Sequence, residues 1–466
     1  MATDSSSKKP LSFRASLIDS PVDIAALAAF RFLFGLMMSL AMVRFIAKGW
    51  VGEFYIQPSF YFTYPGFRWL HPWPGGWMHF HFVLLALLAC GIALGCFYRI
   101  CAVLFFVGFT YVELLDQTTY LNHYYLICLL SGLLAILPAN RAWSVDAWRN
   151  PALRTDTAPA WTLNLLRFQA GVVYFFAGLA KFNADWLFKA EPLRIWLAAR
   201  SDLPFVGPLL DKAWVAYGAS WFGAAFDTSI VFLLLCPRTR KPAYLLAILF
   251  HVATWILFNI GMFPWVMLVA ATVFFSPDWP RNLLLRINVF FGARSICPSF
   301  SQRISAMARR QSSHSASGFR ANAAVFLLLV FYAAIQLALP IRSYLVSGTP
   351  AWTCTGFNCA WRVMIAEKSG YAEFYAFDPA SDRRWKIPTE IYLTPRQEMM
   401  MDQDPDLIRQ MARRMGDDLK QRGRRAVQIN VESFATLNGR PSQRLINPGI
   451  DLAGPTTPGW ILQLAY

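Results

Sequence analysis

Long apolar runs recur along the chain and constrain the fold more than any other feature of the sequence. Most are about 15 to 22 residues long, close to the length that a helix needs to cross roughly 30 Å of hydrocarbon. Hydrophobic residues make up 56% of the chain, so the runs are not isolated patches in a polar protein. We therefore predict a polytopic α-helical membrane protein. The nine predicted transmembrane spans are 24–43, 82–98, 100–115, 124–138, 163–180, 214–235, 244–257, 264–275 and 321–339.

The positive charge indicates membrane orientation rather than a nucleic-acid partner. The formal net charge is +16, but Lys and Arg lie mainly in short connections between apolar runs, where they set topology. With nine spans, every strongly basic connection falls on the side of the N-terminus. These connections contain Lys8 and Lys9, Arg99, residues 141–154, residues 238–241, and the segment 281–320, which holds seven arginines and no acidic residue. The N-terminus is therefore predicted to be cytoplasmic.

Residues 341–466 carry both charge signs and predict a small extracytoplasmic α+β domain. Short strands are expected at 360–365, 371–377, 384–387 and 427–434, and an amphipathic helix at 404–422. The chain then divides into a cytoplasmic tail (1–20), a transmembrane domain with the candidate site (21–340), and this domain (341–466). Cys354 and Cys359 lie close together in it, so either a disulfide or two free thiols is expected.

Polar residues gather at the predicted outer ends of separate spans, beneath the C-terminal domain. They are Asn122 and His123 before the fourth span, Lys181, Asn183, Asp185 and Trp186 after the fifth, and His251 and Asn259 on and after the seventh. Convergence of separate loops on one end of a bundle is what a site at the membrane surface requires. An amine shielded from water loses its proton more readily, so Lys181 is a candidate base and the others are candidate binding groups.

Several of these residues also have a purely structural interpretation. Lys181 fits a snorkelling anchor at a span end, and His123 and His251 fit hydrogen-bonded core histidines. Asp227, inside the sixth apolar run, is the most costly charge in the sequence. Arg167 is its candidate partner in a structural pair.

No metal site is predicted. His79 and His81 alternate rather than taking the i, i+4 spacing of a helical ligand pair. No cluster of cysteines or carboxylates accompanies them.

Several segments resemble the vitamin K-dependent gamma-glutamyl carboxylases, and they occur in the order of that family. They are CFYRICAVLF (96–105), LDQTTYLNHYY (115–125), WSVD (143–146), LRFQAGVVYFFAGLAKFNADW (166–186), FH (250–251), FNIGMF (258–263) and SPDWPR (276–281). A weaker similarity continues into the tail at WRVMIAEKSG (361–370). The chain resembles a shorter, bacterial-type member of the horizontally transferred transmembrane domain (HTTM) superfamily.

The resemblance implies an enzyme, a peptidyl-glutamate 4-carboxylase of the carbon–carbon lyase class. In that family the lysine aligned with Lys181 deprotonates reduced vitamin K, and oxygen converts the quinol to its epoxide through a strongly basic alkoxide. The alkoxide removes a proton from the γ-carbon of a peptide glutamate, and the carbanion captures carbon dioxide. His123 aligns with a histidine assigned to carboxylation. The implied partners are a glutamate-containing peptide or protein on the extracytoplasmic side and the quinone and lipid of a bacterial plasma membrane.

Two departures from the family pattern accompany this resemblance. The family has two adjacent lysines where this chain has Ala180 and Lys181, and animal members carry a longer lumenal part that grips a propeptide. A rival hypothesis is a non-carboxylating superfamily member that binds or oxidises a membrane quinone, or that serves as a membrane partner in a redox or export complex. Such a scaffold has no need of an unpaired Lys181. A transporter is disfavoured, because the sequence shows no repeated half with paired Gly/Pro-broken spans.

Overall fold

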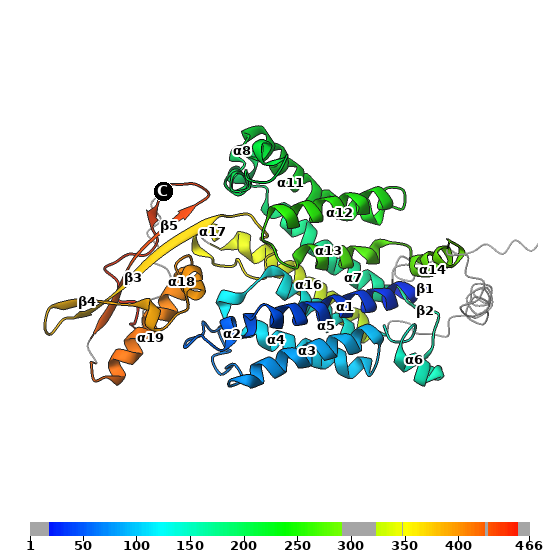
Figure 1. Ribbon diagram of the computed structural model, residues 1–466, viewed down its shortest axis with the longest axis horizontal. Coiled ribbons are helices and arrows are strands. Elements are labelled where there is room, and N and C mark those ends of the chain that lie inside the picture. The colour runs from blue at the N-terminus through cyan, green and yellow to red at the C-terminus, as the bar shows by residue number, and fades with distance from the viewer. Residues whose placement is uncertain (1–17, 291–322, 347, 425–426, 455–466) are drawn as a thin grey trace, which may run out of the picture.

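The computed structural model describes residues 18–290, 323–346, 348–424 and 427–454. These residues form a bundle of helices with a small α+β domain at one end (Figure 1). The predicted basic residues Lys8 and Lys9 and most of the segment 281–320 lie outside the described residues. The helices of the membrane part are α1 (Ala25–Ala47), α2 (Trp50–Tyr55), α3 (Gly76–Leu94), α4 (Tyr98–Leu114), α5 (Asn122–Ile136), α6 (Val145–Arg149), α7 (Ala160–Ala180), α8 (Ala184–Lys189), α9 (Leu193–Ala198), α10 (Gly207–Leu210), α11 (Ala213–Leu235), α12 (Arg240–Leu257), α13 (Phe263–Ala271), α14 (Trp279–Phe290) and α16 (Ala323–Leu345).

Each of the nine predicted apolar runs is helical over most of its described length, and the structure is that of a mostly helical membrane protein. Within the described ranges, five helices are long and apolar enough to cross a membrane: α1, α3, α7, α11 and α16. Helix α5 and the segment Phe263–Phe274 are apolar but shorter. The predicted total of nine spans is therefore not confirmed.

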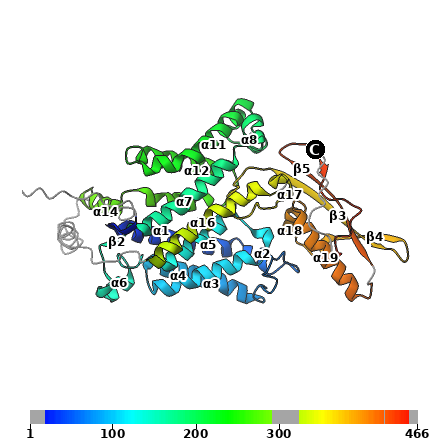
Figure 2. The same cartoon turned by 180° about the vertical axis from the view of Figure 1, so that it is seen from behind.

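The basic turns of the bundle lie at the end opposite the C-terminal domain. Asp146 of α6 accepts hydrogen bonds from the backbone N–H groups of Phe97 and Tyr98, at 2.8 and 3.0 Å, and so ties α6 to the start of α4, whose first turn carries Arg99. Figures 1 and 2 show α6 and α14 at this end and the α+β domain at the other. In Figure 2, α16 crosses the near side of the bundle; its Tyr332 donates a 2.6 Å hydrogen bond to Gln169 of α7.

Helices α7 and α11 approach closely near the C-terminal end of α7. A Cβ added at Gly178 would lie 2.6 Å from the Thr228 side chain and 2.7 Å from its backbone nitrogen, so only glycine fits. The first turns of α11 extend beyond the end of α7 and pack on α8, where the Trp186 indole N–H donates to the carbonyl of Ser220 at 2.8 Å.

The C-terminal domain is a four-stranded antiparallel sheet in the order β4-β3-β5-β6, covered on one face by helices. Its elements are α17 (Pro350–Thr353), β3 (Lys368–Asp378), β4 (Arg383–Ile387), α18 (Pro395–Met401), α19 (Pro405–Gln421), β5 (Gln428–Leu437) and β6 (Gln443–Arg444). Phe374 pairs with both Val431 and Ile387 and lies in the core formed with α19. The Gln397 amide of α18 donates to Asp116 of the bundle at 2.7 Å, which joins the two parts.

One prediction for the C-terminal domain is wrong. Residues 360–365 form a loop rather than a strand, because Trp361 is fully buried in the core of the bundle, with its ring 5.0 Å from that of Tyr125. Of the two states expected for Cys354 and Cys359, a disulfide or two free thiols, the structure has the free thiols. The thiol of Cys354 faces the carbonyl of Gln403, whereas the backbone N–H of Cys359 bonds to the Tyr120 hydroxyl. Burial raises the pKa of Cys354 to about 12.

Candidate active site

Lys181 forms a buried ion pair with Asp227. It caps the C-terminus of α7, and its Nζ atom lies 2.7 Å from Oδ2 of Asp227 and 3.1 Å from the carbonyl oxygen of Ala177. The two side chains are only 7% and 8% exposed. The Nζ atom also lies 5.2 Å from the centre of the Trp186 ring. Lys181 is therefore not a snorkelling anchor, because its amine points into the protein rather than towards water.

The predicted pairing of Asp227 with Arg167 is wrong. The Arg167 guanidinium donates instead to the backbone carbonyls of Val273 and Phe275, at 2.8 and 3.2 Å, after α13. Arg167 and Lys181 are fourteen residues apart on the chain, which is about 21 Å along a helix axis. Asp227 pairs with Lys181 because α11 begins beyond the end of α7, which places the middle of α11 beside Lys181.

A cavity of about 360 Å³ lies beside this ion pair, between α7, α11 and α12. We call it the lysine cavity. Its walls are mainly apolar side chains, with the polar groups of Tyr174, Lys181, Asp227, His251 and Thr254. The Tyr174 hydroxyl and His251 Nε2 are 2.7 Å apart and buried, so each satisfies the other. The expected site residues Lys181, Trp186 and His251 thus meet in one cavity.

A second cavity, of about 490 Å³, contains His123, and we call it the histidine cavity. Asn122 and Asn259 also line it, so the structure brings this expected group together. The His123 ring is buried against Tyr124, at 4.6 Å between ring centres, and lies 6.2 Å from Phe263. Asn259 also accepts a hydrogen bond from Arg200 at 3.2 Å.

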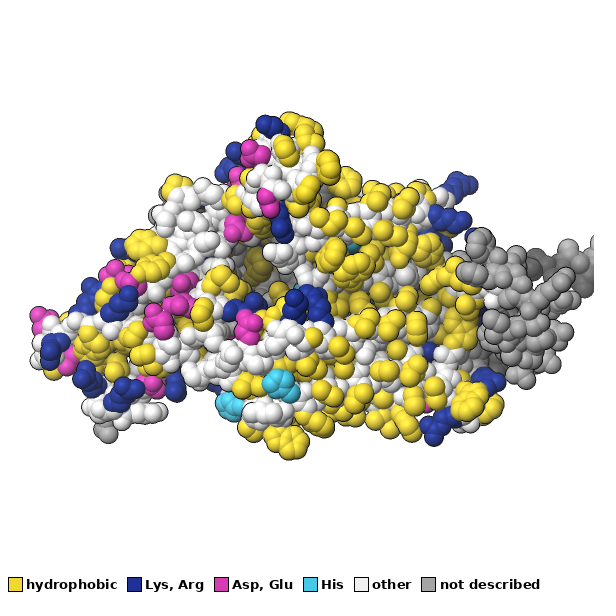
Figure 3. Space-filling model, viewed as in Figure 1, with side chains coloured by type: hydrophobic (Ala, Val, Ile, Leu, Met, Phe, Trp, Pro, Cys, Tyr) yellow, Lys and Arg dark blue, Asp and Glu magenta, His cyan; other side chains and the backbone are white. Residues whose placement is uncertain are grey.

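The two cavities share a wall. Ile260, Phe263, Val363 and Met364 line both of them. Ile260 and Phe263 come from the α12–α13 connection, whereas Val363 and Met364 come from the loop that leads into β3. All four side chains are apolar, so they supply no polar side-chain group where the two cavities adjoin. Figure 3 shows the surface hollowed where the bundle, the C-terminal domain and the segment of short helices α8 to α10 (the α8 region, residues 184–210) meet.

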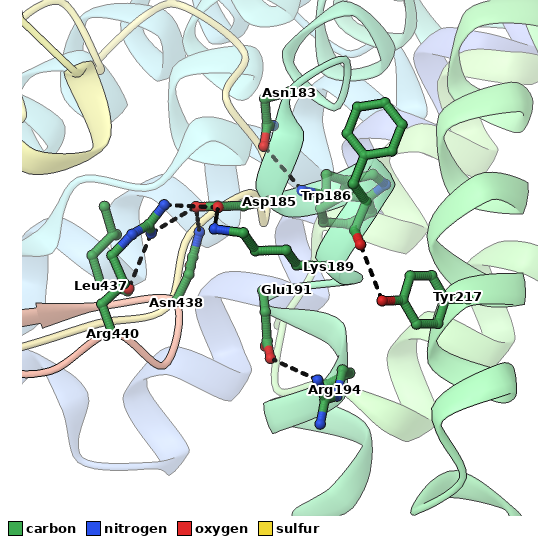
Figure 4. A network of polar contacts seen from close by, with 11 residues as sticks. Asn183, Asp185, Trp186, Lys189, Glu191, Arg194, Tyr217, Leu437, Asn438 and Arg440 are labelled. Carbon is green, nitrogen blue, oxygen red and sulfur yellow. Dashed lines mark hydrogen bonds and ion pairs between the residues drawn. The ribbon is translucent and has the colours of Figure 1, made fainter.

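Asn183 and Asp185 lie outside both cavities and have structural partners (Figure 4). Asn183 caps α8 by accepting a hydrogen bond from the backbone N–H of Trp186 at 3.0 Å. Asp185 forms an ion pair with Arg440 at 2.7 Å and accepts a hydrogen bond from the Asn438 amide at 3.0 Å; both residues lie in the turn after β5. Burial alone would raise the pKa of Asp185, but the hydrogen bonds from Arg440, Asn438 and Lys189 outweigh it and lower that pKa.

Sequence reasoning missed Tyr174 and the arginines of the histidine cavity, Arg44, Arg362 and Arg396. Tyr174 lies seven residues before Lys181, a spacing that places both on one face of a helix and could have found it. The arginines come from three distant segments, so no local pattern links them. Among the described residues, no group of three or more His, Cys, Asp and Glu is placed to hold a metal ion.

Comparison with known families agrees with this architecture. A family model of the HTTM domain matches residues 19–279, and a model of the lumenal domain of vitamin K-dependent gamma-carboxylase matches residues 321–463. No solved structure matches the chain. The first match covers helices α1 to α13 with most of the residues that line the two cavities, and it defines the class, a membrane protein built on an HTTM domain. With the second match added, the chain belongs to the vitamin K-dependent gamma-carboxylase family.

Proposed function

We propose that this chain oxygenates reduced vitamin K, or a related quinol, to its epoxide in the lysine cavity and carboxylates a peptide glutamate in the histidine cavity. The observation that carries the proposal is the buried Lys181–Asp227 pair in an apolar cavity that shares a wall with the cavity of His123. When bound, the quinol would supply, with oxygen, the driving force to remove a proton from the glutamate γ-carbon. Carbon dioxide then adds at that carbon.

The lysine cavity suits a quinol. An aromatic ring with an isoprenoid tail needs apolar walls, and its hydroxyl needs a proton acceptor at one point. Lys181 becomes that acceptor when its proton moves across the 2.7 Å hydrogen bond to Asp227, which leaves a neutral amine and a neutral carboxyl group. This transfer also removes two buried charges, whose desolvation is costly. Asp227 is thus the proposed partner that makes Lys181 a base.

The surrounding residues hold the quinol and exclude water. The Tyr174 hydroxyl and His251 Nε2 are hydrogen-bonded to each other, so the two side chains form a preorganised part of the wall of the lysine cavity. Trp186 packs against the Lys181 amine. Water in the histidine cavity would return the proton to glutamate, so the apolar wall of Ile260, Phe263, Val363 and Met364 favours carboxylation.

The arrangement of the bundle supports an extracytoplasmic site. The basic turns lie at the end away from the C-terminal domain, as expected when that end is cytoplasmic. We therefore propose a multi-pass protein of a plasma membrane with its C-terminal domain outside. Reporter fusions after α6 and after β6 test this; the same compartment for both would contradict it.

The deciding experiment measures epoxide formed by the purified protein with reduced vitamin K, oxygen and bicarbonate. Lys181→Ala and Lys181→Arg should both lower the rate at least 100-fold. Arginine keeps the charge and the pair with Asp227 but does not give up its proton, so its failure identifies basicity rather than charge as the requirement. Lys189→Arg, on an exposed lysine of α8, is the matched control and should keep wild-type activity. Epoxide formation that persists in Lys181→Arg would refute Lys181 as the base.

The same assay separates the proposal from a quinone-oxidising protein without carboxylase activity. A glutamyl peptide with labelled bicarbonate should become carboxylated in the wild type. Epoxide without labelled peptide, across peptides of varied sequence, would support the non-carboxylating alternative.

A further inference from the structure

Three guanidinium groups line the histidine cavity without an acidic partner. They belong to Arg44 at the end of α1, Arg362 in the loop before β3, and Arg396 on α18. The described lining residues include no Asp or Glu. In the described part of the chain, none of the three arginines takes part in an ion pair. The cavity is therefore strongly electropositive.

Aromatic rings hold these guanidinium groups in place. Arg44 lies 5.2 Å from the ring centre of Trp50, and Arg396 lies 4.4 Å from that of Phe54. Trp50 and Phe54 are one turn apart on α2, and their own rings stack at 6.1 Å. Helix α2 thus places a guanidinium from the bundle beside one from the C-terminal domain. A guanidinium that stacks by its face keeps its N–H edges free to donate.

The third arginine is held in the same way. Arg362 lies 4.9 Å from the ring centre of Tyr344, and its Nε atom donates to the Ser343 hydroxyl at 3.2 Å. Its terminal nitrogens have no hydrogen-bond partner among the residues that the structure describes. The Nε atom of Arg396 is buried and has no hydrogen-bond partner among the described residues. An unpartnered buried donor is costly, and an anion in the cavity would satisfy it.

A purely structural role explains the position of only one of the three arginines, Arg44. Arg44 stands in the last turn of α1, where a cation interacts favourably with the helix dipole and reaches the membrane surface. Arg362 and Arg396 come from the part of the chain beyond α16 and need no such anchor. Bringing three like charges to one cavity costs free energy that an anionic ligand repays.

We propose that Arg44 and Arg396, assisted by Arg362, form a clamp for the side-chain carboxylate of the substrate glutamate, with one arm from each domain. The inference rests on the proposed function and names the groups that select its substrate. Arginine pairs with carboxylate in a bidentate geometry, which a neutral amide does not reproduce. Because carboxylation changes the side-chain charge from −1 to −2, the clamp holds the dicarboxylate more tightly than the glutamate.

The test is a binding measurement that needs no quinol. The probes are the N-acetyl amides of glutamate, γ-carboxyglutamate and glutamine, titrated into the full-length protein in nanodiscs and followed by ligand-observed NMR. Affinity should fall in the order γ-carboxyglutamate, glutamate, glutamine. Arg396→Gln and Arg44→Gln should each weaken glutamate binding about tenfold, and Arg396→Lys should weaken it less. Arg414→Gln, which removes a half-exposed arginine of α19 paired with Asp418, should change nothing.

The possible outcomes separate the clamp from the proposed function. Equal affinity for the glutamate and glutamine probes, or unchanged binding in a well-folded Arg396→Gln variant, would overturn the clamp whatever the epoxide assay shows. Displacement of the glutamate probe by millimolar bicarbonate, with equal loss of bicarbonate binding in Arg396→Gln, would assign the arginines to bicarbonate and also overturn it. Arginine-dependent binding with no epoxide formation would keep the clamp and reject the quinol chemistry.

Discussion

The Nζ atom of Lys181 and the Oδ2 atom of Asp227 are 2.7 Å apart, and the backbone of Gly178 makes this distance attainable. Gly178 stands less than one turn before Lys181, and Thr228 follows Asp227 directly, so the close approach of α7 and α11 at Gly178 lies beside the ion pair. Because glycine has no Cβ, two helix backbones can approach each other more closely at a glycine than at any other residue. The geometry of the proposed base therefore depends on a residue with no side chain.

Substitution of this glycine should separate the pair. In Gly178→Ala the new Cβ would meet the Thr228 backbone at 2.7 Å, so α7 and α11 must move apart and Lys181 loses its contact with Asp227. We expect at least a tenfold lower rate of epoxide formation with little change in expression. Gly171→Ala is the matched control on the same helix, because its Cβ meets only the tip of Val231 at 3.4 Å. Equal activity of the two variants would contradict the role of the close approach.

The two cavities predict separable defects. His123 lies in the histidine cavity, across the shared wall from Lys181. His123→Ala should lower carboxylation of a glutamyl peptide tenfold or more while epoxide formation falls less than threefold. The ratio of labelled peptide to epoxide is the measurement. Loss of both products in equal proportion would show that His123 has no separate part in carboxylation.

The contact between Asp185 and Arg440 predicts a pH-dependent link between the α8 region and the C-terminal domain. The pKa of Asp185 is lowered, so its stabilising contribution is present above the ordinary value of 3.8 and disappears as the pH falls through the lowered value. At pH 7, Asp185→Asn should cost roughly 1–2 kcal/mol of stability, since it weakens charge-assisted hydrogen bonds that are partly exposed.

Thermal unfolding followed by tryptophan fluorescence measures this effect. The difference in Tm between the wild type and Asp185→Asn should be largest near pH 7 and shrink below pH 4. Asp211→Asn, on an exposed carboxylate before α11, is the control and should leave Tm unchanged. A difference that grows on acidification would have the wrong sign for a lowered pKa.

Asp402, at the end of α18, predicts the opposite pH dependence. Burial, followed by the charge of Glu398, raises its pKa to about 7, and its Oδ1 atom has no hydrogen-bond partner among the described residues. The buried Asp402 carboxylate therefore lowers the free energy of unfolding at any pH above the ordinary value of 3.8, and this destabilisation grows until about pH 7. Asp402→Asn should raise Tm by several degrees at pH 8, less at pH 5, and not at all below pH 3.8. Asp417→Asn, a mostly exposed carboxylate of α19, should show no such trend.

The helices, and the location of six of the eight expected site residues around the two cavities, were predictable because they follow from the one-dimensional pattern. An apolar run of sufficient length forms a helix in a membrane, and alternating directions bring Asn122 and Lys181 to the same end. The partner of Asp227 was not predictable in this way. The position of Asp227 relative to Lys181 depends on how far α11 extends past the end of α7. That extension is set by the packing of Trp186 on Ser220 and not by the length of the apolar run.

The loop before β3 was wrongly predicted as a strand for a related reason. The residues around Trp361 are apolar and were expected to pack within a sheet, but Trp361 packs against Tyr125 in the bundle. Burial by another domain leaves the same apolar signature as burial within a strand. The arginine cluster is likewise a product of tertiary structure, since Arg44 and Arg396 meet only through the stacked rings of α2.

The shared wall has a consequence for how this architecture can be rearranged. Two of its side chains, Ile260 and Phe263, lie inside the HTTM match, and the other two, Val363 and Met364, lie inside the lumenal-domain match. The modules are distinct in sequence, yet the partition between the two chambers is assembled from both. A chimera with a foreign C-terminal module must bring its own two apolar side chains to that partition, or the two chambers will merge.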